Sequence, residues 1–413
     1  MRRVVITGLG TVNALGPDVK SSWTRMLAGE NGVTPIKNFP AEDLPVRFAA
    51  SVDWNPEELF AGPEFRKLDP FTMFALKATK EALADASLDP ASEPEEKREN
   101  WGTIVGTGIG GISGIVEQHT EMLERGPRRV SPHFIPKIMA NAVSGQVAIR
   151  HGLLGTAFTT SSACASSGHA IAMAFQAIRC GELDLAVTGG AESATTRLSV
   201  AGFANMKALS TRNEAPESAS RPFDKDRDGF VMGEGAGILI FEELEHAQKR
   251  GARIYAEVKG YGSTDDAYHI TAPKEDGAGP ARAFRLAVKM AGIDPETVHY
   301  VNAHGTSTPY NDAIETRALK RFFGTHARKL CISSTKSMIG HLLGASSAVE
   351  LVATALSVHQ ARVHPTRNLT TPDPECDLDY VPGEAREVRI QNALSNSLGF
   401  GGHNISICIG RVD

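Results

Sequence analysis

The chain has 413 residues, 41% hydrophobic and 22% charged, which is enough to bury one large core or two fused ones. Its net charge of −5 at pH 7 argues against a nucleic-acid-binding protein, and its five widely spaced cysteines suit a reducing compartment better than a disulfide framework. The apolar run near the N-terminus is too short for a signal peptide, and no stretch approaches the roughly 18 apolar residues of a membrane span. We therefore expect a cytoplasmic α/β protein with no membrane insertion.

Short apolar runs typical of strands alternate with helical stretches along the whole chain. The predicted strands are Arg3–Thr7, Thr103–Thr107, Ala157–Ser161, Leu183–Thr188, Ile238–Glu242, Arg253–Gly260, His299–Val301, Leu330–Ser333, Gln391–Asn396 and Ile405–Ile409. The predicted helices are Thr72–Ala86, Ile135–His151, Ala165–Gly181, Gly279–Ala291, Ala313–Phe323 and Leu342–Gln360. This alternation indicates mostly parallel sheets covered by helices. The polar stretch 89–100 is expected to be a surface loop.

Two short segments recur, in the same order, in the second part of the chain. The strand that ends in Gly8-Leu9-Gly10 resembles the strand that ends in Gly260-Tyr261-Gly262. The segment SSAC at 161–164 resembles SSTK at 333–336, and both follow an apolar run and precede a helix. We therefore expect two similar halves, residues 1–252 and 253–413, with the larger insertions in the first half.

Two motifs that suggest a nucleotide or a calcium ion lack the residues that would complete them. Residues 106–111 fit GxGxxG after a predicted strand, but no acidic residue ends a second strand at the required distance. We interpret this segment as a tight turn beside a pocket. Residues 224–229 begin like a calcium-binding loop, but Gly235 occupies the position of the essential bidentate glutamate.

Reactive side chains stand beside small residues after several predicted strands. Cys164 precedes a predicted helix, His304 lies in NAHGTSTP (302–309), and Lys336 and His341 lie in the segment 334–350. A cysteine at a helix N-terminus faces free N–H groups and the positive end of the helix dipole, which would lower its pKa. The same N–H groups could hold the oxyanion of a thioester under attack. We interpret Cys164 as a nucleophile rather than as a buried packing residue.

A zinc site is the chemical alternative for one cysteine and two histidines. These residues lack the short paired spacing of structural zinc motifs, and Lys336 would repel the cation. We therefore expect neither a metal nor a cofactor.

The sequence resembles the β-ketoacyl-acyl-carrier-protein synthases of fatty-acid synthesis, most nearly the elongating type II enzymes. The matching segments are RRVVITGLGTV (2–12), ALSTRN (208–213), SRPFDKDRDGFVMGEGAG (220–237), NAHGTSTP (302–309), SSTKSMIGHLLGA (333–345) and GFGGHN (399–404). The resemblance implies a thiolase-like five-layer αβαβα sandwich of two similar halves and a homodimer. It also implies decarboxylative condensation of an acyl thioester with malonyl groups carried on the phosphopantetheine of an acyl carrier protein. A polyketide ketosynthase and, in another class, a non-catalytic carrier-binding protein are the alternatives.

The resemblance also implies residue roles. Cys164 matches the nucleophile, and His304 and His341 match the two histidines that hold the enolate. Lys336 is expected to fix His341 or the water around it, Asp312 and Glu350 to support the cluster, and Phe400 to gate the site. The expected substrate-binding residues are Ile109, at the floor of the acyl pocket, Thr306 and Thr308, along the pantetheine tunnel, and Phe203, Thr271 and Gly401. The expected carrier-protein patch is Lys67, Arg128, Arg129 and Lys207.

Overall fold

One mixed sheet organises the molecule. The computed structural model describes residues 1–60 and 62–412, and within them a 10-stranded sheet has the order β10-β9-β13-β14-β8-β1-β7-β6-β4-β5. Its strands are β1 (Val4–Val12), β4 (Trp101–Gly106), β5 (Ala157–Thr160), β6 (Leu185–Glu192), β7 (Gly235–Glu243), β8 (Ala256–Asp265), β9 (Val298–Asn302), β10 (Cys331–Ser333), β13 (Asn392–Gly399) and β14 (His403–Gly410). Every strand expected from the sequence is present. Two further pairs are short: β2 (Thr34–Pro35) with β3 (Phe48–Ala49), and β11 (Arg362–Val363) with β12 (Arg386–Glu387).

The strand order is the same on both sides of the central β1–β8 pair. From the centre outward, β1-β7-β6-β4-β5 on one side corresponds to β8-β14-β13-β9-β10 on the other. The first repeated segment lies on the central strands β1 and β8, and the second lies at the ends of the edge strands β5 and β10. The division of the chain at residues 252 and 253 stays a prediction.

The expectation of mostly parallel sheets is wrong. Strand β4 is parallel to β5 and β6, and β9 is parallel to β10 and β13, but the other pairings are antiparallel. The short turn Phe400–Gly402 joins β13 directly to β14, which only an antiparallel pair allows. The central strands β1, β7, β8 and β14 therefore run against their neighbours.

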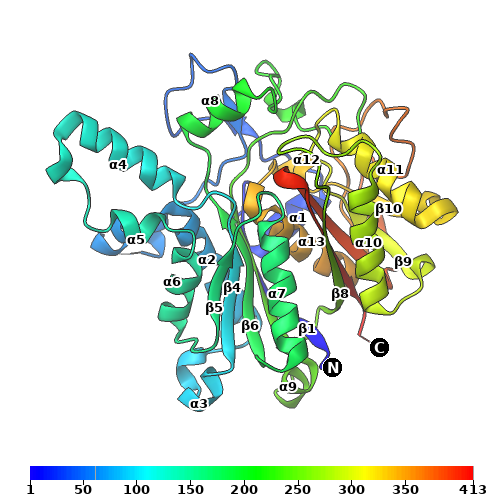
Figure 1. Cartoon of the computed structure of the whole chain (residues 1–413), viewed down its shortest axis with the longest axis horizontal. Coiled ribbons are helices and arrows are strands. Elements are labelled where there is room, and N and C mark those ends of the chain that lie inside the picture. Colours follow the sequence, from blue (N-terminus) through cyan, green and yellow to red (C-terminus); the bar gives the residue numbers. More distant parts are fainter. Residues whose placement is uncertain (61, 413) are drawn as a thin grey trace.

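Helices form three layers around the two halves of the sheet (Figure 1). The helices are α1 (Val19–Leu27), α2 (Pro70–Asp85), α3 (Glu95–Arg98), α4 (Ile112–Arg125), α5 (Phe134–Ile138), α6 (Ala142–His151), α7 (Ser166–Cys180), α8 (Arg197–Asn205), α9 (Leu244–Lys249), α10 (Ala278–Ala291), α11 (Asn311–Phe323), α12 (Lys336–Ile339) and α13 (Ser346–Gln360). Helices α2 and α6 cover one half, α10 and α11 cover the other, and α7 and α13 lie between them. This arrangement is the expected αβαβα sandwich.

The central helices carry small side chains because they are packed between the two halves of the sheet. All residues of α13 from Ser346 to Val358 are buried. In α7, a Cβ atom at Gly168 would come within 2.6 Å of Ile405 on β14, so only glycine allows this close approach. Both helices begin at the same end of the sandwich, directly after the loops that contain Cys164 and His341.

The helix boundaries differ from the prediction in a few places. The predicted helix 135–151 is two helices, α5 and α6, because the backbone becomes extended at Met139. The stretch 89–100, expected to be a loop, contains a 3₁₀ turn (Pro90–Ser92) and the short helix α3. Helices α1, α4, α8, α9 and α12 are not among the predicted helices. No helix in the described part of the chain is long and apolar enough to cross a membrane.

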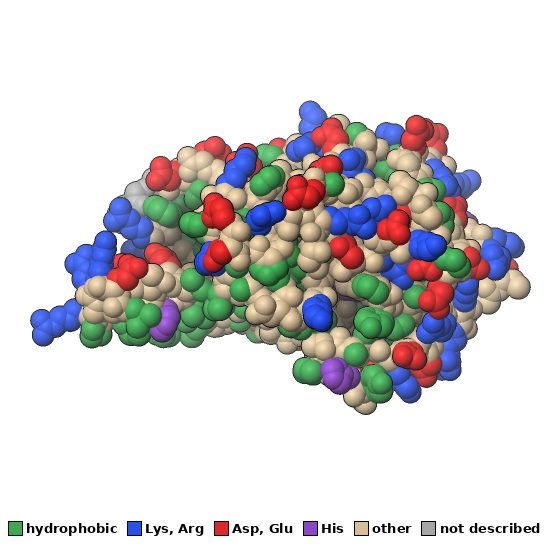
Figure 2. Space-filling model, turned by 90° about the horizontal axis from the view of Figure 1, so that it is seen from above, with side chains coloured by type: hydrophobic (Ala, Val, Ile, Leu, Met, Phe, Trp, Pro, Cys, Tyr) green, Lys and Arg blue, Asp and Glu red, His purple; other side chains and the backbone are tan. Residues whose placement is uncertain are grey.

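Helices α4 and α5 form an arm that projects from the body of the protein (Figure 1). Basic side chains gather at the far end of this arm, beside exposed apolar ones (Figure 2). The turn after α4, Pro127–Arg129, supplies two arginines there.

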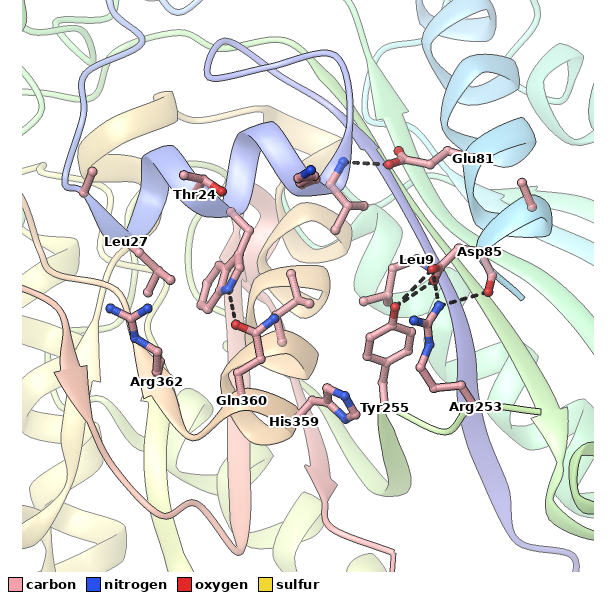
Figure 3. Close-up of a pocket in the computed structure, with 16 residues that line it drawn as sticks. Leu9, Thr24, Leu27, Glu81, Asp85, Arg253, Tyr255, His359, Gln360 and Arg362 are labelled. Carbon is pink, nitrogen blue, oxygen red and sulfur yellow. Dashed lines mark hydrogen bonds and ion pairs between the residues drawn. The ribbon is translucent and has the colours of Figure 1, made fainter. Parts of the chain in front are cut away.

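A hollow of about 860 Å³ lies between α1, α2, the end of α13 and the segment before β8 (Figure 3). Its polar side chains bind one another: Trp23 Nε1 donates to Gln360 Oε1 at 2.8 Å, and the Tyr255 hydroxyl donates to Asp85 Oδ2 at 3.0 Å. None of the candidate site residues lines it.

Candidate active site

A second cavity, of about 440 Å³, brings together residues from both parts of the sequence. Its lining includes Cys164, His304, His341, Phe400, Ile109, Phe203, Thr271, Thr306, Thr308 and Lys207. Of the predicted catalytic, supporting and substrate-binding residues, four lie outside the lining: Lys336, Glu350, Asp312 and Gly401. The first three are buried behind the cavity, and Gly401 donates its N–H to the carbonyl of Ile270 at 2.7 Å.

Cys164 lies in a sharp turn between β5 and α7. Ala163 adopts a φ of +50°, which turns the chain immediately before the cysteine. The hydroxyl of Ser166 stabilises this turn, because it accepts a hydrogen bond from Ser162 N at 2.8 Å and donates one to the Ala163 carbonyl at 2.6 Å. The turn places a cysteine that is 8% exposed in the wall of the cavity.

The expectation of a lowered cysteine pKa is wrong for this structure. Burial raises the pKa of Cys164 to about 11. Lys336 and the N–H groups of Phe400 and Cys164 act in the opposite direction but do not offset the loss of solvation. Cys164 is therefore a neutral thiol at neutral pH.

His341 contacts the cysteine directly. Its Nε2 lies 3.0 Å from Cys164 Sγ. Its Nδ1 accepts a hydrogen bond from Leu343 N at 3.3 Å and lies 2.8 Å from the Ser346 hydroxyl. Burial, followed by the charge of Lys336, lowers the pKa of His341 well below its usual value. The ring is thus neutral with its hydrogen on Nε2, toward the cavity.

His304 has the same tautomer for a different reason. Lys336 Nζ lies 3.2 Å from His304 Nδ1, and an ammonium group can only donate, so Nδ1 accepts. Burial, then Lys336 and His341, lower the pKa of His304 well below its usual value. The two imidazole rings are 5.3 Å apart and nearly perpendicular, at 85°. Both histidines therefore present an Nε2–H donor.

Lys336 was expected to fix His341 or the water around it, but the histidine that its ammonium group contacts is His304. Its ammonium group also lies 2.5 Å from Glu350 Oε1, and both side chains are 1% exposed. Burial raises the pKa of Glu350 to about 7, although Lys336 acts to lower it. This buried pair fixes Lys336 behind the ring of His304.

The turn that carries His304 is held by acidic side chains of α11. Glu315 accepts hydrogen bonds from His304 N and Gly305 N, each at 2.9 Å, through its two carboxylate oxygens. Asp312 Oδ2 accepts from Phe223 N at 2.8 Å and Ser307 N at 3.2 Å. Sequence reasoning missed Glu315. Its role could have been suspected from the sequence, because Glu315 comes three residues after Asp312 and therefore lies on the same face of the helix.

The groups of the nucleotide-like motif (106–111) and of the calcium-like motif (224–229) form hydrogen bonds within the protein. The N–H groups of Gly108, Ile109 and Gly110, where a phosphate would bind, donate to the carboxylate of Glu192. This turn lies beside the cavity, as expected. In the calcium-like loop, Asp224 Oδ2 accepts from Thr370 N and Thr371 N, each at 2.8 Å.

The hydrogen bonds of the two histidines do not suit a metal. Cys164, His304 and His341 each offer a ligand atom, and these atoms lie within 4.8 Å of one another. A metal-bound histidine usually donates its other ring N–H to an acceptor. Here the second nitrogen of each ring faces a donor, which favours catalysis by hydrogen bonding over zinc binding.

The predicted basic patch is spread over several elements. Lys207 lines the cavity. Lys67 ends a 3₁₀ helix (Gly62–Lys67) before α2, and Arg128 and Arg129 lie at the end of the α4–α5 arm. Arg129 Nε is 3.8 Å from Glu121 on α4.

The αβαβα sandwich, with a cysteine and two neutral histidines meeting where its central helices begin, defines a thiolase-like condensing enzyme. The sequence matches "Beta-ketoacyl synthase, N-terminal domain" over residues 1–247 and "Beta-ketoacyl synthase, C-terminal domain" over residues 255–370. The chain belongs to the β-ketoacyl synthase family, and it is a condensing acyltransferase.

Relatives of known name resemble the chain over its whole length. It is 49% identical to a 3-oxoacyl-[acyl-carrier-protein] synthase 2 of Synechocystis sp., over 98% of this chain and 97% of that protein. It is 48% identical to the protein of the same name from Rhizobium meliloti, over 100% and 99%. Among solved structures, a β-ketoacyl synthase of Burkholderia phymatum has a TM-score of 0.91 at 38% identity, covering 100% of both chains. A type II polyketide ketosynthase solved in complex with its acyl-carrier protein has a TM-score of 0.92 at 36% identity, also covering 100% of both.

Proposed function

We propose that this enzyme condenses an acyl thioester with malonyl-acyl-carrier-protein, with loss of carbon dioxide, in fatty-acid elongation. The product is a β-ketoacyl-acyl-carrier-protein two carbons longer. The observation that carries the proposal is the contact of 3.0 Å between His341 Nε2 and Cys164 Sγ, with His304 in the same cavity. A nucleophile and two hydrogen-bond donors are the groups that this reaction needs.

The first half-reaction is acyl transfer to Cys164. Its sulfur attacks the carbonyl of the incoming thioester, the thiol proton passes to the departing carrier thiol, and an acyl-enzyme remains. The N–H groups of Cys164 and Phe400 both interact with the sulfur, so they are placed to hold the oxyanion that forms beside it. Phe400 lines the cavity next to Cys164, which suits a gating role.

The second half-reaction uses the two histidines. The malonyl group loses carbon dioxide, and the Nε2–H groups of His304 and His341 hold the negative oxygen of the resulting enolate. The enolate carbon attacks the Cys164 thioester, a carbon–carbon bond forms, and the cysteine sulfur leaves as a thiolate that takes up a proton. Neutral rings suit this role, because each ring keeps the hydrogen on Nε2 and donates a hydrogen bond without transferring the proton.

The remaining predicted residues surround these groups. Ile109 and Phe203 supply apolar wall for the acyl chain, and the hydroxyls of Thr306 and Thr308, 2.9 Å apart, supply polar wall for the pantetheine arm. Thr271 also lines the cavity, and Gly401 belongs to the turn that carries Phe400.

The carrier protein is the partner, and Lys67, Arg128, Arg129 and Lys207 are the residues proposed to receive its acidic surface.

A homodimer is supported by the edge position of β5, where Phe158 is 39% exposed. Leu123 and Ile135 of the α4–α5 arm are also exposed, at 70% and 57%. A cytoplasmic location agrees with the five cysteines, all of them free.

Fatty-acid elongation is favoured over polyketide synthesis by the degree of similarity. The relatives named for acyl-carrier-protein synthases are 48–49% identical to this chain, whereas a type II polyketide ketosynthase among the structural neighbours is 36% identical. A non-catalytic carrier-binding protein would not need the histidine pair.

Intact-mass measurement after mixing with acyl-carrier proteins of different chain lengths tests the proposal. We expect an acyl adduct on the enzyme, and a product two carbons longer when malonyl-carrier is added. Cys164→Ala should remove the adduct, whereas Cys180→Ala, at an exposed cysteine, should keep it. Absence of an adduct with every chain length would overturn the assignment.

A further inference from the structure

A buried glutamate that belongs to none of the roles above joins two turns of the active site. Glu192, the last residue of β6, is 0% exposed. Its Oε2 accepts hydrogen bonds from Gly108 N at 2.7 Å and Gly344 N at 3.0 Å. Its Oε1 accepts from the Thr107 hydroxyl at 3.0 Å and from Ile109 N at 3.2 Å.

The two turns are in direct contact around this carboxylate. A Cβ atom at Gly344 would lie 2.1 Å from Gly108 N and 2.7 Å from Glu192 Oε2. A Cβ atom at Gly108 would lie 2.8 Å from the same oxygen. Glycine at both positions lets the backbones approach closely enough for one carboxylate to bind both.

Each turn carries a group of the proposed reaction. Gly108 and Ile109 line the cavity beside Cys164. On the other side, Gly344 follows Leu343, whose N–H donates to His341 Nδ1 at 3.3 Å. The carboxylate therefore connects the wall of the acyl pocket to the loop of the histidine.

We propose that Glu192 is a positioning residue that limits the acyl chain by holding the Thr107–Gly110 turn, and with it Ile109, against the His341 loop. This inference rests on the proposed function. A carboxylate is needed because all its partners named here are N–H or O–H donors, so both oxygens must accept. His341 has its own contacts to Ser346 and Leu343, and it depends less on Glu192 than Ile109 does.

Glu192→Gln tests the inference. The amide NH2 group would replace either Oε2, the acceptor of Gly108 N and Gly344 N, or Oε1, the acceptor of Ile109 N. In either case the Thr107–Gly110 turn would lose an acceptor and move. We expect the ratio of kcat/KM values for long and short acyl-carriers to change by roughly ten-fold, the effect of a pocket altered by about a methylene. Release of carbon dioxide from malonyl-carrier should change by less than about three-fold, since it needs only the histidine donors.

The matched control is Glu242→Gln. Glu242 is also a 0% exposed glutamate on a neighbouring strand, but its carboxylate binds Arg250 and His246 and lies outside the cavity lining. The Glu242→Gln variant should be less stable than the wild type, but its ratio of kcat/KM values for long and short acyl-carriers should be unchanged. Thr107→Val is the milder second variant, because it removes one hydroxyl donor to Glu192 and one acceptor of Gly110 N but leaves the carboxylate in place. It should shift the ratio in the same direction by less.

The outcomes are distinguishable. If the wild-type enzyme elongates no acyl-carrier, the proposed function fails. If the wild-type enzyme elongates and both Glu192→Gln and Thr107→Val keep its chain-length ratio, the role of Glu192 is overturned. If Glu192→Gln does not fold, an unchanged ratio in Thr107→Val is sufficient to overturn it.

Discussion

Lys336 holds His304 in the tautomer that the proposed reaction needs. Its Nζ lies 3.2 Å from His304 Nδ1, and it is itself fixed by Glu350 at 2.5 Å. Because the ammonium group has no lone pair to offer, the ring hydrogen must be on Nε2. A cation that does not line the cavity thus decides which nitrogen points into it.

Lys336→Met should slow decarboxylation more than acyl transfer. Without the ammonium donor, His304 is free to adopt the other tautomer, and loss of a hydrogen bond to a charged group costs about 1.5–3 kcal/mol, or roughly 10- to 100-fold. Carbon dioxide release from malonyl-carrier should fall by about this factor, while mass spectrometry should show acyl loading of Cys164 within a few-fold of wild type. Lys274→Met, at an exposed lysine, is the control. Equal losses in both half-reactions would contradict the tautomer role.

Cys164→Ala should abolish condensation. The alanine has no sulfur to carry the acyl group, so chain extension should fall by at least about 10³-fold. Product formation from acyl- and malonyl-carrier, followed by mass spectrometry, checks this. Retained chain extension would rule out Cys164 as the acyl-carrying residue.

His304→Ala and His341→Ala should each impair carbon dioxide release from malonyl-carrier. Removal of one donor to a developing oxyanion typically costs 10²- to 10³-fold. His341→Ala should also change the reactivity of Cys164, because only this histidine is in hydrogen-bond contact with the sulfur. His326→Ala, at a buried histidine bonded to the Val298 carbonyl, controls for loss of a buried ring. Unchanged carbon dioxide release in both site variants would refute their role at the enolate.

Alkylation of Cys164 by iodoacetamide should accelerate continuously with pH. Burial raises the pKa of Cys164 to about 11. Below that value, the thiolate fraction and hence the rate should rise about ten-fold for each pH unit. Intact-mass time courses between pH 7 and pH 9, with Cys164→Ala to subtract the other cysteines, give this rate. A plateau near neutral pH would show that the helix start stabilises the thiolate after all.

Glu242→Gln should lower stability, and by more at neutral pH than in acid. Burial alone would raise the pKa of Glu242, but hydrogen bonds from Arg250, His246 and Thr7 lower it from 4.5 to about 2. A carboxyl group with a lowered folded-state pKa stabilises the protein above its unfolded pKa, and this contribution is lost as the pH falls through the folded value. The variant should lose roughly 3 kcal/mol at pH 7, and less at pH 3. Urea unfolding at the two pH values measures the difference, and an equal loss at both would contradict it.

Much of the molecule could be predicted from local sequence. Strands and most helices follow from apolar periodicity, a short-range property that each segment carries by itself. The short motifs around Cys164, His304 and His341 predicted the candidate reactive residues, and the structure brings these three side chains together in one cavity. The repeated segments predicted two equivalent groups of strands, and β1 with β8 and β5 with β10 occupy equivalent places.

Only the tertiary structure decided the strand directions, the protonation states and the supporting carboxylates. Strand β1 is antiparallel to β7 and β8 because of how distant segments meet, which local periodicity does not encode. The pKa of Cys164 rises because the folded protein removes water from it, an effect larger than the local helix start that the sequence shows. Lys336 acts on His304 from 32 residues away, and Glu192 binds Gly344 from 152 residues away. The sequence determined which groups are available, and long-range packing determined which of them meet and in which protonation state.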